Sequence, residues 1–94
     1  MDIGEVKRLI RFVAKGSGLV RTSRHCRERM RERGVSELDL QQVLLWGEVS
    51  ELRMDQDRSN LKCTVSGDDL DGEPLTIQVA LWPEESAVVC ITVY

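Results

Sequence analysis

The spacing of the apolar residues changes at Gly47, and this change constrains the fold more than any other feature of the chain. Before Gly47, apolar residues recur at intervals of three and four, which is the period of an amphipathic helix. After it, apolar and polar residues alternate, as in the stretch that contains Leu61, Cys63 and Val65. Alternation is typical of a strand with one buried face. A helical part followed by a strand part predicts an α+β fold.

Three helices are predicted before this change, over residues 3–15, 23–34 and 36–46. Ser23 and Ser36 are predicted N-caps, because their hydroxyl groups accept hydrogen bonds from the free N–H groups of a first turn. Gly34 and Gly47 end the second and third helices. Residues 19–22 are predicted to be an extended link between the first helix and the second. The apolar face of the third helix is assigned to Leu38, Val43 and Leu44, with Trp46 as a further candidate.

Four strands are predicted after Gly47, over residues 48–55, 61–66, 75–82 and 87–94. A polar turn at 55–60 separates the first two, and short connections favour antiparallel pairing of consecutive strands. The last strand is apolar at nearly every position, so it is predicted to be central and covered on both faces. The predicted fold class is therefore α+β, with about three N-terminal helices packed on a four-stranded antiparallel sheet. All of it forms a single domain of residues 1–94.

The net charge is distributed unevenly along the chain. The whole chain carries −3 at pH 7, but residues 21–33 hold six arginines against two glutamates. This segment is therefore at +4, and the remaining residues are at −7. An acidic body with one basic helix predicts a small, localised anion site. Because no apolar run is long enough to span a membrane and the start does not resemble a signal peptide, we expect a cytoplasmic protein without a membrane partner.

The cysteine and histidine content argues against several kinds of site. Cys26, Cys63 and Cys90 lie in apolar patterns, so they are predicted to be reduced thiols of the core. One histidine and three scattered cysteines supply no pair of metal ligands at usable spacing, so we expect no metal and no cofactor. Cys26 directly follows His25, and consecutive helical residues point about 100° apart, which disfavours a cysteine nucleophile.

The second helix carries the one strong functional signal of the sequence. His25, Arg29 and Arg33 recur every four residues, so they form a contiguous strip on a helix that turns about 100° per residue. Cys26 and Met30 are predicted to point into the core beside this strip. The strip therefore follows the border between core and solvent, where the residues of a groove lie.

Two segments resemble a known family. The first is His-x3-Arg-x3-Arg-Gly-φ-Ser within residues 25–36, and the second is Val-Cys-Ile-Thr-Val-Tyr at 89–94. In this order they resemble a family of small bacterial proteins of unknown function that is related to the RelE/ParE toxin superfamily, with BrnT and MqsR relatives. The resemblance covers residues 22–94 and leaves residues 1–18 as an N-terminal helical extension.

The resemblance implies a RelE/ParE-like fold and a toxin of a type II toxin–antitoxin system. Members of the wider superfamily include metal-independent endoribonucleases, which cut RNA and are each paired with a neutralising antitoxin protein. The RNA would be either free or ribosome-bound mRNA. The residues carried over are His25, Arg29, Arg33 and Tyr94 as catalytic residues, and Lys62 and Thr92 as substrate-binding residues.

Metal-free cleavage of RNA needs a base for the 2′-hydroxyl proton, cations for the phosphate and an acid for the leaving 5′-oxygen. Histidine side chains as a class titrate near neutral pH, so His25 is assigned as general acid or base. The planar guanidinium of arginine binds two phosphate oxygens at once, so Arg29 and Arg33 form the predicted phosphate clamp. Tyr94 is assigned either as a second proton donor or as a stacking platform for a base.

The assigned residues have structural alternatives. Thr92 can be an ordinary strand residue, and Tyr94 can fray at the end of the chain or dock on a partner. His25 can cap a carbonyl, Arg33 gains from the dipole of any helix that it ends, and Lys62 can be a solvated strand position. For the whole protein, the alternatives are a non-catalytic module that binds a protein partner and a toxin-fold member without activity. The sequence pI of about 5.1 favours these alternatives, because an acidic surface repels RNA.

Overall fold

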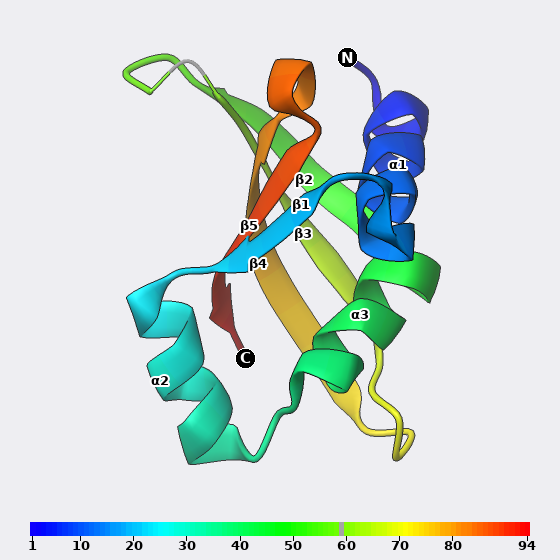
Figure 1. The fold of residues 1–94 in the computed structure, drawn as a ribbon, viewed down its shortest axis with the longest axis vertical. Coiled ribbons are helices and arrows are strands. Elements are labelled where there is room, and N and C mark those ends of the chain that lie inside the picture. Colours follow the sequence, from blue (N-terminus) through cyan, green and yellow to red (C-terminus); the bar gives the residue numbers. More distant parts are fainter. Residues whose placement is uncertain (59) are drawn as a thin grey trace.

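The computed structural model describes residues 1–58 and 60–94, so the predicted polar turn at 55–60 contains one residue, Ser59, that lies outside the described residues. Figure 1 shows the helices and strands along the chain. Their bounds are α1 Ile3–Phe12, the π-helical turn η1 Val13–Ser17, β1 Leu19–Thr22, α2 Arg24–Arg33, α3 Glu37–Trp46, β2 Glu48–Asp55, β3 Asn60–Asp68, β4 Pro74–Trp82, the 3-10 turn η2 Pro83–Glu85 and β5 Ala87–Val93. The α+β class and its three helices are confirmed.

The sheet has five strands instead of the four predicted, and it is mixed instead of antiparallel. The strand order is β1-β5-β4-β3-β2. β2 to β5 pair antiparallel in sequence order, as predicted. β1, which was expected to be an extended link, pairs with β5 as a parallel strand. β5 therefore lies inside the sheet, with a neighbour on each side.

β1 is missing from the sequence prediction because backbone pairing, and not an apolar face, holds it in the sheet. Its four residues are exposed or half-buried. The N–H of Leu19 donates to the carbonyl of Ser86 and the N–H of Ser23 donates to the carbonyl of Cys90, each at 3.0 Å. A Cβ atom at Gly18 would collide with the Ser86 carbonyl, so a glycine is needed where β1 enters the sheet. A parallel pair also joins segments that are far apart in sequence, which leaves no local pattern.

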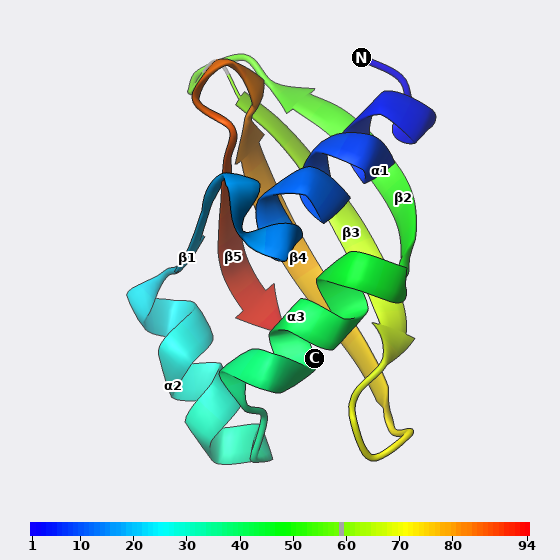
Figure 2. The ribbon, with the colours of Figure 1, turned by 45° about the vertical axis from the view of Figure 1, so that its right-hand side comes forward.

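Two of the helices cover one face of the sheet. Figures 1 and 2 show α1 and α3 lying across that face, with α2 beside the β1–β5 side of the molecule. Val6 and Ile10 of α1 and Val43 of α3 are at most 1 % exposed, as are Ile77 and Val79 of β4. These side chains form the core between the helices and the sheet. Burial of apolar surface away from water is the main contribution that stabilises a domain of this size.

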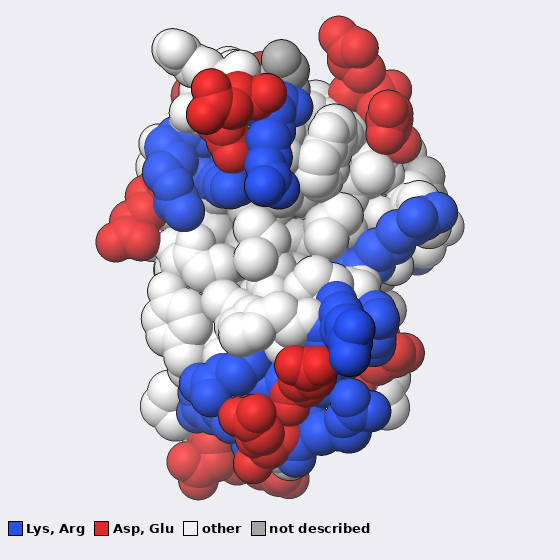
Figure 3. Space-filling model, turned by 90° about the vertical axis from the view of Figure 1, so that its left-hand side faces the viewer, with Lys and Arg blue, Asp and Glu red and all other residues white. Residues whose placement is uncertain are grey.

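The opposite face of the sheet, which we call the open face, carries mostly polar side chains. Lys62, Thr64 and Gln78 alternate with the buried core residues of β3 and β4. Figure 3 views the molecule from the α2 side and shows Lys and Arg side chains at both ends of an uncharged area, over α2 below and toward the β2–β3 hairpin above. The alternation predicted for these strands is therefore confirmed.

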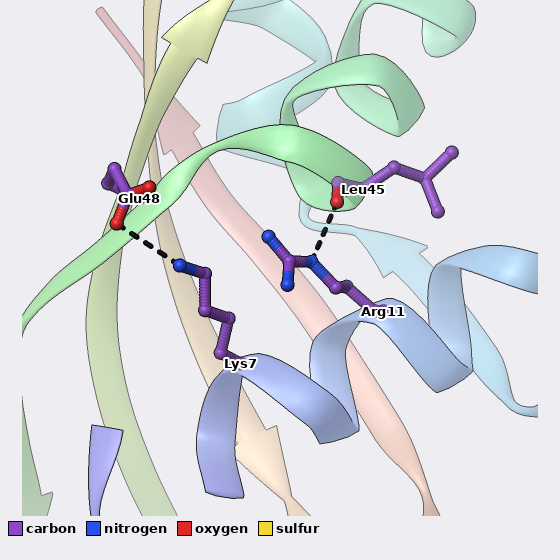
Figure 4. A network of polar contacts seen from close by, with 4 residues as sticks. All are labelled: Lys7, Arg11, Leu45 and Glu48. Atoms are coloured by element: carbon purple, nitrogen blue, oxygen red, sulfur yellow. Dashed lines mark hydrogen bonds and ion pairs between the residues drawn. The ribbon is translucent and has the colours of Figure 1, made fainter. Parts of the chain in front are cut away.

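Two long side chains of α1 contact the start of β2 and the end of α3 (Figure 4). Lys7 Nζ lies 3.1 Å from Glu48 Oε2. Arg11 Nε donates to the carbonyl of Leu45 at 2.8 Å, and this carbonyl belongs to the last turn of α3. The Arg11 contact satisfies a helix-end carbonyl that has no partner within its own helix. Both contacts fix the position of α1 relative to α3 and the sheet.

The predicted helix ends are confirmed by their hydrogen bonds. Ser23 Oγ accepts from the N–H of Cys26 at 3.0 Å, and Gly34 has φ 68°, the left-handed conformation expected after a helix. Ser36 and Asp39 form a reciprocal capping box at the start of α3. These signals are local, so the sequence alone was sufficient to find them.

The apolar face predicted for α3 is partly wrong. Val43 and Leu44 are buried, but Leu38 is 63 % exposed and Trp46 is 69 % exposed. Leu40, which is 3 % exposed, takes the place expected for Leu38. At about 100° per residue, Leu38 lies roughly 160° from Leu40 around the helix, so the two cannot share a face.

Replacing Asp39 with asparagine is expected to lower the free energy of unfolding at neutral pH by about 1–3 kcal/mol. The Asp39 carboxylate accepts from the N–H of Ser36 at 2.9 Å, from its hydroxyl at 3.0 Å and from the N–H of Leu70 at 3.1 Å. An amide has only one acceptor oxygen, whereas the carboxylate uses both of its oxygens. In the variant, the donors that contact one of these two oxygens would therefore lose their acceptor. Urea unfolding of the wild-type and Asp39→Asn proteins measures the difference.

The same difference is expected to shrink in acid. Hydrogen bonds from the backbone of Ser36 and Leu70 hold the pKa of Asp39 below its usual value. A carboxyl whose pKa is lower in the folded state contributes stability above its unfolded pKa of about 3.9, and loses it as the pH falls through its folded pKa. An Asp39→Asn penalty that stays constant through this range would contradict the assignment.

Candidate functional site

The first turn of α2 is tied to β5 by a single serine. Ser23 Oγ donates to the carbonyl of Ile91 at 2.8 Å while it accepts from the N–H of Cys26. The N–H of Ser23 donates to the carbonyl of Cys90 at 3.0 Å. The start of α2, which carries His25, is therefore fixed next to β5 at the residue just before Thr92.

The core side of α2 agrees with the sequence prediction. Cys26 is 0 % exposed and Met30 is 7 % exposed. Burial raises the pKa of Cys63 to about 11 and that of Cys90 to about 12, and it also raises the pKa of Cys26. All three thiols are free and stay protonated at neutral pH, so they are poor nucleophiles.

The three residues of the predicted strip differ in their surroundings. His25 is exposed, and the imidazole has no hydrogen-bond partner among the residues that the structure describes. Arg29 is half-buried, and its Nη1 lies 3.0 Å from Oε2 of Glu32 on the same helix. Arg33 is exposed in the last turn. An exposed ion pair contributes only about 0–1 kcal/mol, so a phosphate can replace Glu32 as the partner of Arg29.

Four polar residues form a row across the open face. Pairing in the sheet aligns Ser50 of β2 with Thr64 of β3, Thr64 with Gln78 of β4, and Gln78 with Thr92 of β5. Paired residues of antiparallel strands point to the same face, so the predicted binding residue Thr92 lies beside Gln78. The sequence marks Gln78 only as a polar position in an alternating strand, and it gave no reason to single it out.

Gln78 connects this row to the end of the chain. Its Nε2 donates to Thr64 Oγ1 and to the Tyr94 hydroxyl, each at 2.7 Å. Its Oε1 accepts from Arg53 Nη2 at 3.3 Å. The backbone of Tyr94 continues the sheet by exchanging two hydrogen bonds with Thr76, each at 2.9 Å. Tyr94, which is 50 % exposed, is thus held at both its backbone and its side chain.

An irregular stretch of β2 brings an acidic residue into the same network. The pairing of β2 with β3 shifts between Ser50 and Arg53, and Glu51 has φ 53° in this bulge. A positive φ is unfavourable for glutamate, and such residues are frequent at functional sites. Glu51 Oε2 accepts from Thr64 Oγ1 at 2.8 Å, and the Glu51 carbonyl accepts from Arg53 Nη1 at 3.2 Å. No sequence signal predicts the bulge.

Lys62 is occupied by a different contact. Its Nζ lies 3.0 Å from Oδ2 of Asp55, and this ion pair and hydrogen bond hold the pKa of Asp55 below its usual value. Lys62 is paired across the sheet with Arg53, so it lies one row away from Gln78. The structure therefore links Tyr94 to the row of Thr92 through Gln78 and fixes the start of α2 beside Ile91, while the charge of Lys62 is already paired.

Two further findings concern the described residues, 1–58 and 60–94. None of their helices is long and apolar enough to cross a membrane. They also contain no group of three His, Cys, Asp or Glu side chains arranged to hold a metal ion.

Comparison with known proteins gives one match. The model of the family DUF4258, a domain of unknown function, matches residues 22–94. No curated protein and no solved structure matches the chain. The matched region begins at the last residue of β1 and includes α2, α3 and the other four strands. It therefore contains every residue of the candidate site, and the chain belongs to the DUF4258 family.

Proposed function

We propose that this protein is a metal-independent endoribonuclease that cuts RNA where α2 meets β5. The observation that carries the proposal is the double hydrogen bond of Ser23, which accepts from Cys26 and donates to Ile91. It fixes the first turn of α2 beside the strand that bears Thr92 and Tyr94. A histidine, two arginines and a tyrosine are thereby carried by neighbouring elements.

In the proposed reaction, the 2′-oxygen of the substrate attacks the adjacent phosphorus, and the bond from phosphorus to the 5′-oxygen breaks. His25 takes the proton of the attacking 2′-hydroxyl group as general base. Arg29 and Arg33 stabilise the negative charge that builds on the phosphate, a role for which permanently charged, bidentate side chains are suited. Tyr94, which directly follows β5, gives a proton to the leaving 5′-oxygen. The products carry a 2′,3′-cyclic phosphate and a 5′-hydroxyl group.

The resemblance to the RelE/ParE superfamily adds a biological context to this proposal. A type II toxin stops growth when it is made alone, and a cognate antitoxin protein neutralises it. The partners in this context are RNA, free or in ribosome-bound mRNA, and the antitoxin. The support is the pair of motifs at residues 25–36 and 89–94, both of which lie in the candidate site.

Incubation of the purified protein with labelled single-stranded RNA tests the proposal. We expect cleavage that persists in excess EDTA, because no step uses a metal. RNA with 2′-O-methyl groups of the same sequence should stay intact, because its 2′-oxygen cannot attack. Absence of cleavage in both free RNA and a translating extract would contradict the enzyme and favour a module that binds a protein partner.

A further inference from the structure

The amide group of Gln78 can adopt only one of its two orientations. Arg53 is always a donor, because a guanidinium has no acceptor atom. Its Nη2 lies 3.3 Å from one end of the Gln78 amide, so this end must be the carbonyl oxygen. The NH2 end then faces both the Thr64 hydroxyl and the Tyr94 hydroxyl, at 2.7 Å from each. Arg53 thus sets the direction of every hydrogen bond in the network.

The orientation of the Gln78 amide determines which hydrogen bonds the hydroxyl groups of Thr64 and Tyr94 can donate. The Thr64 hydroxyl accepts a hydrogen bond from Gln78 and donates one to Glu51 Oε2 at 2.8 Å. Tyr94 also accepts from Gln78, so its O–H proton points elsewhere. Among the described residues, the Tyr94 hydroxyl donates to no acceptor. Tyr94 is 50 % exposed, so its hydroxyl group is available to donate a hydrogen bond to a ligand.

Arg53 adds a positive charge next to this donor. Its two hydrogen bonds go to the Gln78 amide oxygen and to the Glu51 carbonyl, which are both neutral acceptors. Within the described residues, no carboxylate lies within ion-pair distance of Arg53, in contrast to Lys62, which is paired with Asp55. The guanidinium is exposed, yet it is oriented against the sheet by two contacts.

We propose that Arg53, Gln78 and Tyr94 form a binding site for a phosphodiester group of RNA on the open face of the sheet. Arg53 and Tyr94 donate to the phosphate oxygens, and Gln78 is a positioning residue that keeps the tyrosine proton available. The inference rests on the proposed function, because it adds Arg53 and Gln78 to the contacts that hold the backbone of the same substrate, with Tyr94 as the residue common to both.

A nucleic-acid strand fits this surface better than an isolated anion does. Figure 3 shows Lys and Arg side chains, with acidic side chains among them, at both ends of an uncharged area, over α2 and toward the β2–β3 hairpin. A polymer with regularly repeated negative charges can contact both ends at once, whereas a single anion contacts one. The hydroxyl of Thr92 lies in the row of Gln78, between β4 and α2, and offers a further contact along this path.

Binding of a fluorescent 2′-O-methyl RNA of mixed sequence, measured by anisotropy, tests the inference without cleavage. Arg53→Ala is expected to weaken binding about tenfold. It should also reduce the slope of log K against log salt by about 0.7, the value for one contact to a single-stranded phosphate. Tyr94→Phe is expected to weaken binding several-fold without changing the slope, because it removes a neutral donor. Arg8→Ala, an equal change of charge on α1, is the matched control.

Three results would overturn the inference. The first is an Arg53→Ala affinity no lower than that of Arg8→Ala, and the second is a Tyr94→Phe affinity equal to that of the wild-type protein. The third is displacement of the RNA by polyglutamate as effectively as by unlabelled RNA, which would assign the surface to an acidic protein partner. If these variants lose binding but the wild-type protein cuts no RNA, the binding site stands and the proposed cleavage fails. If cleavage occurs and its KM is insensitive to both variants, only the binding site fails.

Discussion

Replacing His25 with alanine is expected to lower the rate of RNA cleavage by about 100- to 10,000-fold, the usual contribution of a positioned general acid or base. The histidine is exposed and makes no hydrogen bond among the described residues, so its removal should leave the fold unchanged. Exposed substitutions without such contacts usually change stability by less than about 0.5 kcal/mol. The loss should appear in kcat, because His25 acts on protons and not on binding.

The matched control for His25 is Arg31 on the same helix. Arg31 is exposed, and at about 100° per residue it points about 120° away from His25 around α2. Arg31→Ala should change kcat by less than a few-fold. Growth after expression in bacteria provides a second readout, with arrest by the wild-type protein and no arrest by His25→Ala. Equal arrest by both would contradict catalysis and favour the non-catalytic binding module.

The sequence predicted the parts of this fold that depend on local physics. Each helix cap, at Ser23, Ser36 and Gly34, involves residues within one turn of each other. The change of period at Gly47 is visible in the spacing of the apolar residues. Both kinds of signal can be recognised without a structure. The buried side of α2 followed from the angular positions of Cys26 and Met30 around the helix. Local hydrogen bonding and amphipathic spacing are sufficient for such predictions.

What the sequence missed depends on contacts between distant segments. The parallel pairing of β1 with β5, the bulge at Glu51 and the partners of Gln78 are all set by neighbouring strands. The predicted cation Lys62 shows the same limit, because its partner Asp55 lies across a strand pair. The sequence therefore predicted one part of the candidate site and not the other. The residues of α2 came from a helical period, whereas the network around Arg53 required the register of the sheet.

Replacing Gly47 with alanine is expected to destabilise the fold by about 3 kcal/mol, the upper end of the usual effect of overpacking. A Cβ atom at this position would lie 2.6 Å from the carbonyl oxygen of Val43, 2.8 Å from that of Ser66 and 3.0 Å from a methyl group of Val65. Two of these three obstacles are backbone atoms, which cannot turn away. The cause is lack of space and not backbone strain, because Gly47 has φ −74°, which any residue adopts.

The position of Gly47 explains why the clash cannot be relieved locally. Its N–H donates to the carbonyl of Val43 at 2.7 Å to close α3, and the next residue, Glu48, already pairs with Ser66 in β3. Moving Gly47 away from one carbonyl therefore disturbs either the end of α3 or the start of β2. The residue at which the apolar period changes thus lies tightly packed between the end of α3 and β3.

Thermal unfolding measures this prediction, with Gly4→Ala as the matched control. About 3 kcal/mol corresponds to a fall in Tm of roughly 10–25 °C for a domain of this size. Gly4 lies in α1, where a Cβ atom would have ordinary contacts, the nearest being Asp2 Oδ1 at 3.4 Å. The same substitution there should stabilise the protein by about 0.5–1 kcal/mol, because glycine is unfavourable in a helix. A Gly47→Ala protein that melts within about 2 °C of the wild type would show that α3 and β2 can separate without cost. The close junction between helix and sheet would then contribute little to the stability of the fold.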